Sequence, residues 1–148
     1  MYVANNDSKS ISIVDGQTNQ LVTSVKVGRG PDAVAIDRNT SKVYVANSKD
    51  DTISVIDPKM NAVVGKIPVG RGPAFVAIDP KMQKVYVASN DRSVSVIDIR
   101  KNKVVGKPIP VGRGLEIVGN IPVGRGLEGL AVNTNMHTVR ERSIDCMH

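Results

Sequence analysis

The sequence predicts an all-β protein built from consecutive four-stranded antiparallel sheets. The first observation behind this prediction is a repeat, because Tyr2, Tyr44 and Tyr86 follow one another at intervals of 42 residues. The second is that Gly, Pro, Asn and Asp bound the short apolar runs, as they do in β-hairpins. The third is composition: valine is abundant, whereas the chain has one Phe, three Tyr and no Trp. β-Branched side chains of this kind favour strands.

Each repeat contains four strand-like segments in a fixed order. In the second repeat these are KVYVA (42–46), TISVID (52–57), AVVGKIPV (62–69) and AFVAID (74–79). The segments between them, such as NSKDD, PKMN and GRGP, have the composition of turns. Because VYVA and SVID are apolar at nearly every position, both faces of each sheet are expected to be buried against neighbouring sheets. No helical periodicity occurs before residue 133.

A repeat of about 40–45 residues with four strands is typical of the blades of a β-propeller. We therefore expect an incomplete β-propeller, with AFVAID as an innermost strand and AVVGKIPV as an outermost one. On this assignment the chain holds three strands of one blade, whole blades at about 33–69 and 75–111, and a damaged fourth. A closed ring needs at least about four blades. Open edges are thus expected, either in a fragment of a longer propeller or in a short propeller that completes its ring by self-association.

The motifs YVAN, ISVID, IPVGRGP and VAID, recurring in one order, resemble those of the YVTN family of β-propeller repeat proteins. The resemblance is close over residues 1–118 and weaker over 121–139. It implies a propeller of about seven blades in a surface-layer or other exported protein, and hence an extracellular or cell-surface location. It also implies similarity in fold to the haem d1, quinoprotein and lactonase propellers. The family motif itself carries no catalytic residue.

The end of the chain departs from this pattern. The segment IPVGRGLE occurs at 109–116 and again at 121–128, which marks a duplication of 12 residues within 109–132. Of the two copies, the second leads into a better match to VAID, so residues 129–133 are predicted to form the innermost strand of the last blade. An irregular excursion is then expected near 115–122. The partial propeller is predicted to span 1–139, followed by a non-repeat tail at 140–148 without blade structure.

Composition excludes several classes of function. The net charge is +6, but most of the excess lies in residues 100–148, which contain no aromatic side chain on which bases could stack. Nucleic-acid binding is therefore not expected. No apolar run reaches the roughly 20 residues of a membrane-spanning helix. The single Cys146 excludes an internal disulfide, and His137 and His148 both lie near the end, where they assemble no catalytic triad or zinc site.

Carboxylates recur at the ends of strands. Asp15, Asp57 and Asp98 follow one type of strand, while Asp37 and Asp79 follow the innermost type. Recurrence in each repeat favours Asx-type turns, in which the side chain accepts a hydrogen bond from the backbone two residues on. Acid–base or metal chemistry is the alternative. A further set of loop carboxylates has a spacing that fits no recognised calcium loop: Asp7, Asp50, Asp51 and Asp91.

The motif VGRG does not indicate a phosphate-binding loop, because it lacks both a following helix and the ending GK[ST]. Instead, Gly28 and Gly30 are expected to supply positive φ, and Pro31 to fix the start of the next strand. The intervening arginines, Arg29, Arg71 and Arg113, are expected on one rim near the loop carboxylates. They are either solvated or locally paired, or they form a cationic arc that binds a polyanionic glycan or an acidic partner.

The sequence thus predicts a non-catalytic repeat segment of a surface or exported binding scaffold. We expect no enzyme activity, no cofactor, and no catalytic, cofactor-binding or metal residues, with a protein or a glycan as the ligand. One alternative is a fragment of a propeller enzyme of lactonase, quinoprotein or haem d1 type whose active site lies outside this chain. The other is the self-associating short propeller.

Overall fold

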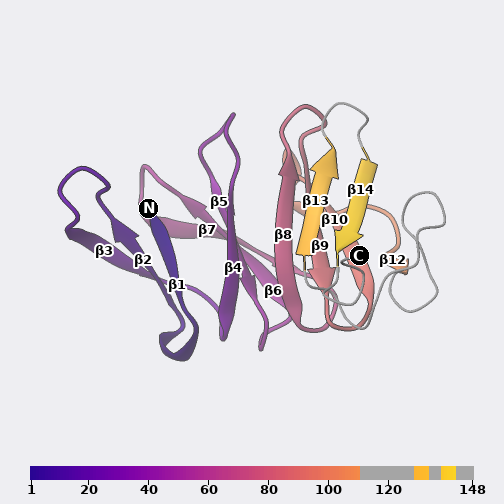
Figure 1. The fold of residues 1–148 in the computed structure, drawn as a ribbon, viewed down its shortest axis with the longest axis horizontal. Coiled ribbons are helices and arrows are strands. Elements are labelled where there is room, and N and C mark those ends of the chain that lie inside the picture. The colour runs from indigo at the N-terminus through magenta and orange to yellow at the C-terminus, as the bar shows by residue number, and fades with distance from the viewer. Residues whose placement is uncertain (111–128, 134–137, 143–148) are drawn as a thin grey trace.

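A computed structural model describes residues 1–110, 129–133 and 138–142 of the chain. These residues form antiparallel sheets and one short 3-10 helix, η1 (Asn6–Ser8), with no α-helix among them. Figure 1 shows the sheets following one another along the molecule, from the indigo N-terminal strands to the yellow strands β13 and β14. The predicted all-β class is therefore confirmed.

Strands that are consecutive in sequence pair with one another, in the order predicted for blades. The first sheet is β1 (Tyr2–Asn5), β2 (Ser10–Val14) and β3 (Leu21–Lys26), and the second is β4 (Pro31–Ile36), β5 (Val43–Asn47), β6 (Thr52–Asp57) and β7 (Ala62–Pro68). The third is β8 (Pro73–Asp79), β9 (Lys84–Ser89) and β10 (Ser93–Asp98), with β11 (Lys103–Val104) and β12 (Ile109–Pro110) both pairing to β10. The fourth described sheet is β13 (Gly129–Asn133) and β14 (Thr138–Arg142).

The innermost strands lie side by side. β4 packs beside β8, and β8 packs beside β13 (Figure 1). This places β13, at residues 129–133, in the position of an innermost strand, so the choice of the second copy of the duplication is confirmed. The excursion expected at 115–122 lies outside the described residues. Successive sheets arranged through their innermost strands make the described fold an incomplete β-propeller.

One expectation for the C-terminal end is wrong. Residues 140–142 were expected to lack blade structure, but they form the second half of β14. Arg142 pairs with Gly129, and Thr138 pairs with Asn133, so the hairpin is in continuous register. Backbone pairing does not depend on the tyrosine that opens the equivalent strands, which explains how Arg140 can occupy such a place. Residues 143–148 lie outside the described part of the chain.

Both faces of the second sheet are buried, as the apolar runs predicted. Val43, Val45 and Ile56 cluster with side chains of the first sheet, including Ile11 and Val25. The alternate positions of the same strands face the other way. Tyr44, Ala46, Ile53 and Val55 cluster with Val85, Val87 and Ile97 of the third sheet. Successive side chains of a strand point to opposite faces, so a sheet between two others needs apolar residues at every position.

Tyr44, the second of the three repeated tyrosines, packs between two blades. It is fully buried between the second and third sheets, and its hydroxyl has no hydrogen-bond partner among the described residues. Burial, with a smaller contribution from the negative charge of Asp37, raises the pKa of Tyr44 from 10.0 to about 12. Burial also raises the pKa of Tyr86, which packs with Phe75 and Val96 on the far face of the third sheet.

We expect Tyr44→Phe to raise the free energy of unfolding by about 1 kcal/mol, because it removes a buried hydroxyl without a partner. The phenol loses its proton near pH 10 in the unfolded chain but near pH 12 in the folded one. Stability is thus fully present below pH 10 and is lost as the pH rises toward 12. Urea unfolding at pH 8 and pH 11 measures how much free energy of unfolding each protein loses as the pH rises. Tyr44→Phe should lose less than the parent protein. Equal losses in the two proteins would contradict this interpretation.

Candidate functional site

One rim of the sheets is built from turns that begin with aspartate. In each of them the carboxylate accepts a hydrogen bond from the amide two residues on, at 2.8 Å for Gln17 to Asp15, 3.1 Å for Asn39 to Asp37, 2.8 Å for Lys59 to Asp57, 3.0 Å for Lys81 to Asp79 and 2.8 Å for Arg100 to Asp98. The fifth residue of each turn has a φ between 49° and 62°. The predicted Asx-type turns are confirmed, and each of these five carboxylates stabilises the backbone of its own turn.

The two described VGRG motifs, at 27–30 and 69–72, lie on the opposite rim, where each packs against the loop after the second strand of the following blade. The amide of Ser48 donates to the carbonyl of Gly30 at 2.8 Å, and the amide of Asn90 donates to that of Gly72 at 3.0 Å. Gly30 and Gly72 have φ values of 65° and 63°, as predicted for Gly30. These turns and loops share one face, as the repeat predicted.

The expectation that Gly28 also has positive φ is wrong. Gly28 is required for a different reason, because a Cβ atom built on it lies 2.7 Å from Cγ of Asn47 and 2.7 Å from Oδ2 of Asp50. Asn47 is fully buried, and its side-chain amide donates to the hydroxyl of Ser54 at 2.8 Å. The turn therefore lies against a fixed side chain that leaves no room for a methyl group.

The first arginine of the predicted arc is paired. Nε of Arg29 lies 2.6 Å from Oδ1 of Asp50, and the backbone amide of Arg29 donates to Oδ2 at 2.7 Å. The hydrogen bond from Arg29 holds the pKa of Asp50 below its usual value, and the same contact raises the pKa of Arg29. Because the side chain of Arg29 is 60% exposed, salt screens this ion pair.

The second arginine is placed differently. The backbone amide of Arg71 donates to Asp91 at 3.0 Å, but its guanidinium forms no ion pair within the part of the chain that the structure describes. Arg113 lies outside the described residues. The anion-binding arc of Arg29, Arg71 and Arg113 therefore stays a prediction, with Arg29 already neutralised by Asp50.

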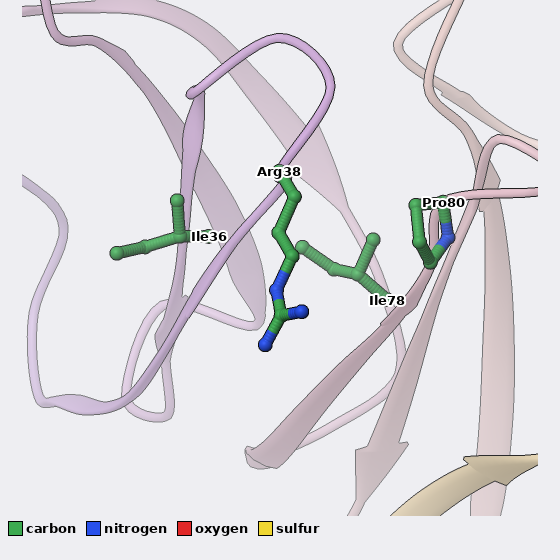
Figure 2. Close-up of a pocket in the computed structure, with 4 residues that line it drawn as sticks. All are labelled: Ile36, Arg38, Ile78 and Pro80. Carbon is green, nitrogen blue, oxygen red and sulfur yellow. The ribbon is translucent and has the colours of Figure 1, made fainter.

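A pocket of about 350 Å³ lies on the Asx-turn rim, between the ends of β4 and β8. It is lined by Ile36, Arg38, Ile78 and Pro80, and Figure 2 shows the side chain of Arg38 extending between the two isoleucines. Ile36 is 48% exposed. Among the described residues, the guanidinium of Arg38 makes no hydrogen bond or ion pair. An unpaired cation thus adjoins apolar surface.

Arg38 belongs to none of the recurrent motifs of the sequence. Ile36 and Ile78 occupy equivalent positions in two repeats, but Arg38 stands where the next repeat has Pro80. This departure from the repeat, at the end of an innermost strand, is the feature of the sequence that could have pointed to Arg38. The sequence does not show that Arg38 lines a pocket, because the pocket forms only when the ends of β4 and β8 come together in the folded chain.

A second depression on this rim, of about 460 Å³, lies between the turns after β4 and β6. Several of its polar groups already take part in the turns. The hydroxyl of Thr40 donates to Asp37 at 2.6 Å, and Asp57 accepts the amide of Lys59. Unlike the Arg38 pocket, it is lined by no large aliphatic side chain beside its charged groups.

The described residues contain no group of three or more His, Cys, Asp or Glu side chains that could hold a metal ion. His137, Cys146 and His148 lie outside them. In the described part of the chain, no helix has the length and apolar character needed to cross a membrane.

Comparison with known proteins bears on the fold. The sequence matches no family model and no curated protein. Among solved structures, hydrazine synthase from Kuenenia stuttgartiensis is similar over 90% of this chain, with a TM-score of 0.77 and 23% identity. The structure of U3-55K is similar over 88%, with a TM-score of 0.72 and 14% identity. A functionally unknown protein from Desulfotomaculum acetoxidans is similar over 90%, with a TM-score of 0.72 and 19% identity.

The chain spans 36%, 38% and 39% of the lengths of these three solved chains, respectively. At such identities the similarity concerns the fold alone. It agrees with the incomplete β-propeller formed by the consecutive sheets.

Proposed function

We propose that this chain is a non-catalytic β-propeller segment of the YVTN type that serves as a binding scaffold in a surface or exported protein. Three kinds of observation support the proposal. The blades repeat in sequence and in pairing order. The recurrent carboxylates at the strand ends accept hydrogen bonds from backbone amides, so their role is structural. The described residues bring together no group of three or more His, Cys, Asp or Glu side chains that could hold a metal ion.

The observation that carries the binding role is the Arg38 pocket. The Arg38 guanidinium offers five donors, has no partner among the described residues and lies beside two isoleucines, which suits a ligand with a carboxylate and an aliphatic part. Two features of a protein ligand have this chemistry. One is an acidic side chain next to an apolar residue, and the other is the terminal carboxylate of an apolar C-terminal residue. The pocket lies at the ends of innermost strands, where two neighbouring blades supply the contacts.

Hexanoate is a simple probe of this site. We expect it to shift the NMR signals of the Ile36 and Ile78 methyl groups, whereas hexanol at the same concentration should shift them much less. Arg38→Gln should weaken hexanoate binding roughly tenfold, because a charge-assisted hydrogen bond is lost. Arg100→Gln removes the same charge from another exposed turn and should leave binding unchanged. Equal binding by the two variants would remove the basis for the site.

A second candidate is a segment of a propeller enzyme. The similarity in fold to a chain of hydrazine synthase, of which this chain spans 36%, favours it. The two candidates differ in a simple observable. A haem or quinone absorbance band in the purified protein would favour the enzyme, whereas a spectrum of tyrosine and phenylalanine alone is expected for the scaffold.

A further inference from the structure

The large apolar side chains that are exposed gather at one rim of the sheets. This is the rim of the Asx turns, which span residues 15–20, 37–42, 57–62, 79–84 and 98–103. Nine such side chains occur among the described residues, and six lie within an Asx turn or at the two positions after it: Leu21, Val22, Met60, Val63, Val64 and Met82. None of the nine lies in a described VGRG turn or in the loop packed against it. The two rims therefore differ in apolar exposure.

Two of the Asx turns carry the same exposed tripeptide. Pro-Lys-Met occurs at 58–60 and again at 80–82. Met60 is 66% exposed and Met82 is 44% exposed, and each follows an exposed lysine. Neither methionine belongs to a hydrophobic cluster of the described residues. Packing within the described fold thus does not account for these two side chains.

The outermost strands add to this apolar surface. β3 and β7 both begin directly after an Asx turn, and the two strands pack beside each other. Leu21 and Val22 open β3, while Val63 and Val64 lie near the start of β7, and all four are exposed. Exposed apolar residues on adjoining elements are typical of an interaction surface, whereas single ones scattered over a protein are not.

The Asx-turn rim is also the more cationic of the two rims. Its five turns contain eight Lys or Arg and five Asp, and within the described residues none of these eight cations forms an ion pair. On the opposite rim, Asp50 pairs with Arg29 and also lies 3.8 Å from Nζ of Lys66. The turns and loops there contain five Lys or Arg and four Asp, within 6–9, 27–30, 48–51, 69–72 and 90–92.

Neighbouring Asx turns form a continuous surface. The depression of about 460 Å³ lies between the turns after β4 and β6, and both Lys42 and Lys59 line it. On the other side of the turn after β4, the side-chain amide of Asn39 donates to the carbonyl of Pro80 at 3.0 Å. The two Pro-Lys-Met turns therefore flank the turn after β4.

We propose that the Asx-turn rim docks on the surface of an anionic lipid bilayer. Met60, Met82 and the apolar residues at the starts of β3 and β7 enter the headgroup region, while the lysines and arginines contact lipid phosphates. Lys42 and Lys59 hold a headgroup phosphate between them in the depression. A soluble polyanion would match the charge of this rim, but it would not use the exposed methionines. A bilayer matches both features.

This proposal goes beyond the proposed function and does not rest on ligand binding by the Arg38 pocket. Because that pocket opens on the same rim, a bound bilayer would exclude a protein ligand from it. The two sites are tested separately by changing Met60 and Met82, which do not line the pocket. The variant with Met60→Ser and Met82→Ser should still bind hexanoate.

Vesicles of phosphatidylcholine, with and without an equal part of phosphatidylglycerol, test the proposal with the whole chain. We expect cosedimentation with the anionic vesicles that weakens at high ionic strength, and little with phosphatidylcholine alone. Lys59→Gln with Lys81→Gln should weaken binding roughly tenfold. Lys9→Gln with Lys49→Gln removes the same charge from exposed lysines of the opposite rim and should leave binding unchanged. Equal weakening by the two pairs would show that net charge alone governs binding, which overturns the proposal.

A fluorescent reporter separates insertion into lipid from attraction by charge. The chain contains no tryptophan, so Met60→Trp introduces a single one. Its emission should shift to the blue on anionic vesicles, whereas that of Lys49→Trp should not. The variant with Met60→Ser and Met82→Ser should bind these vesicles roughly tenfold more weakly, because it loses apolar contact. If Met60→Trp shows no shift, or if the double methionine variant binds like the parent protein, then the rim does not enter lipid and the proposal is wrong.

Discussion

Val45→Ala is expected to lower the free energy of unfolding by about 2 kcal/mol, whereas Val3→Ala is expected to lower it by less than about 0.5 kcal/mol. Val45 is fully buried between the first and second sheets, so its truncation loses transfer free energy and leaves a cavity. Val3 occupies the equivalent position on β1 but is 38% exposed and has no sheet against that face among the described residues. Urea unfolding of both variants measures the difference.

Val87→Ala is the control for this comparison, because Val87 is the third equivalent valine and is also fully buried. It should behave like Val45→Ala. If all three variants lose a similar free energy of unfolding, then Val3 is covered in solution. The conclusion that this face of the first sheet is open would then be wrong.

Gly28→Ala is expected to lower the free energy of unfolding by about 2 kcal/mol, within the range of overpacked sites. The added methyl group would lie 2.7 Å from Cγ of Asn47, and this buried side chain is held by its bond to Ser54. Gly16→Ala is the matched control, because nothing lies within 4 Å of its Cβ position and its φ is not positive. That change should be neutral or stabilising by up to about 0.5 kcal/mol.

Thermal or urea unfolding of both glycine variants checks this expectation. If Gly28→Ala unfolds like the parent protein, then the VGRG turn does not rest on Asn47. The conformational argument for Gly30 would be unaffected, since it depends on a φ of 65° rather than on close approach.

The architecture could be predicted because its signals are local. Apolar runs bounded by turn residues define strands, and a side chain such as Asp57 reaches its hydrogen-bond partner only two residues away. The features that were mispredicted or missed depend on distant residues. Gly28 is constrained by Asn47 across a loop contact, and Arg38 gains its significance from Ile78 in the next blade. Sequence patterns within one repeat do not report such contacts.

The consecutive pairing of strands within each sheet has a consequence for synthesis on the ribosome. The second sheet is complete once residues 31–68 have emerged, because each strand pairs only with a neighbour in sequence. Its Tyr44 face, however, is covered by Val85, Val87 and Ile97, which are translated later. Nascent chains at that stage present a finished sheet with one bare apolar face. We expect a chaperone that recognises exposed apolar surface to bind during this interval and to leave as the third sheet forms.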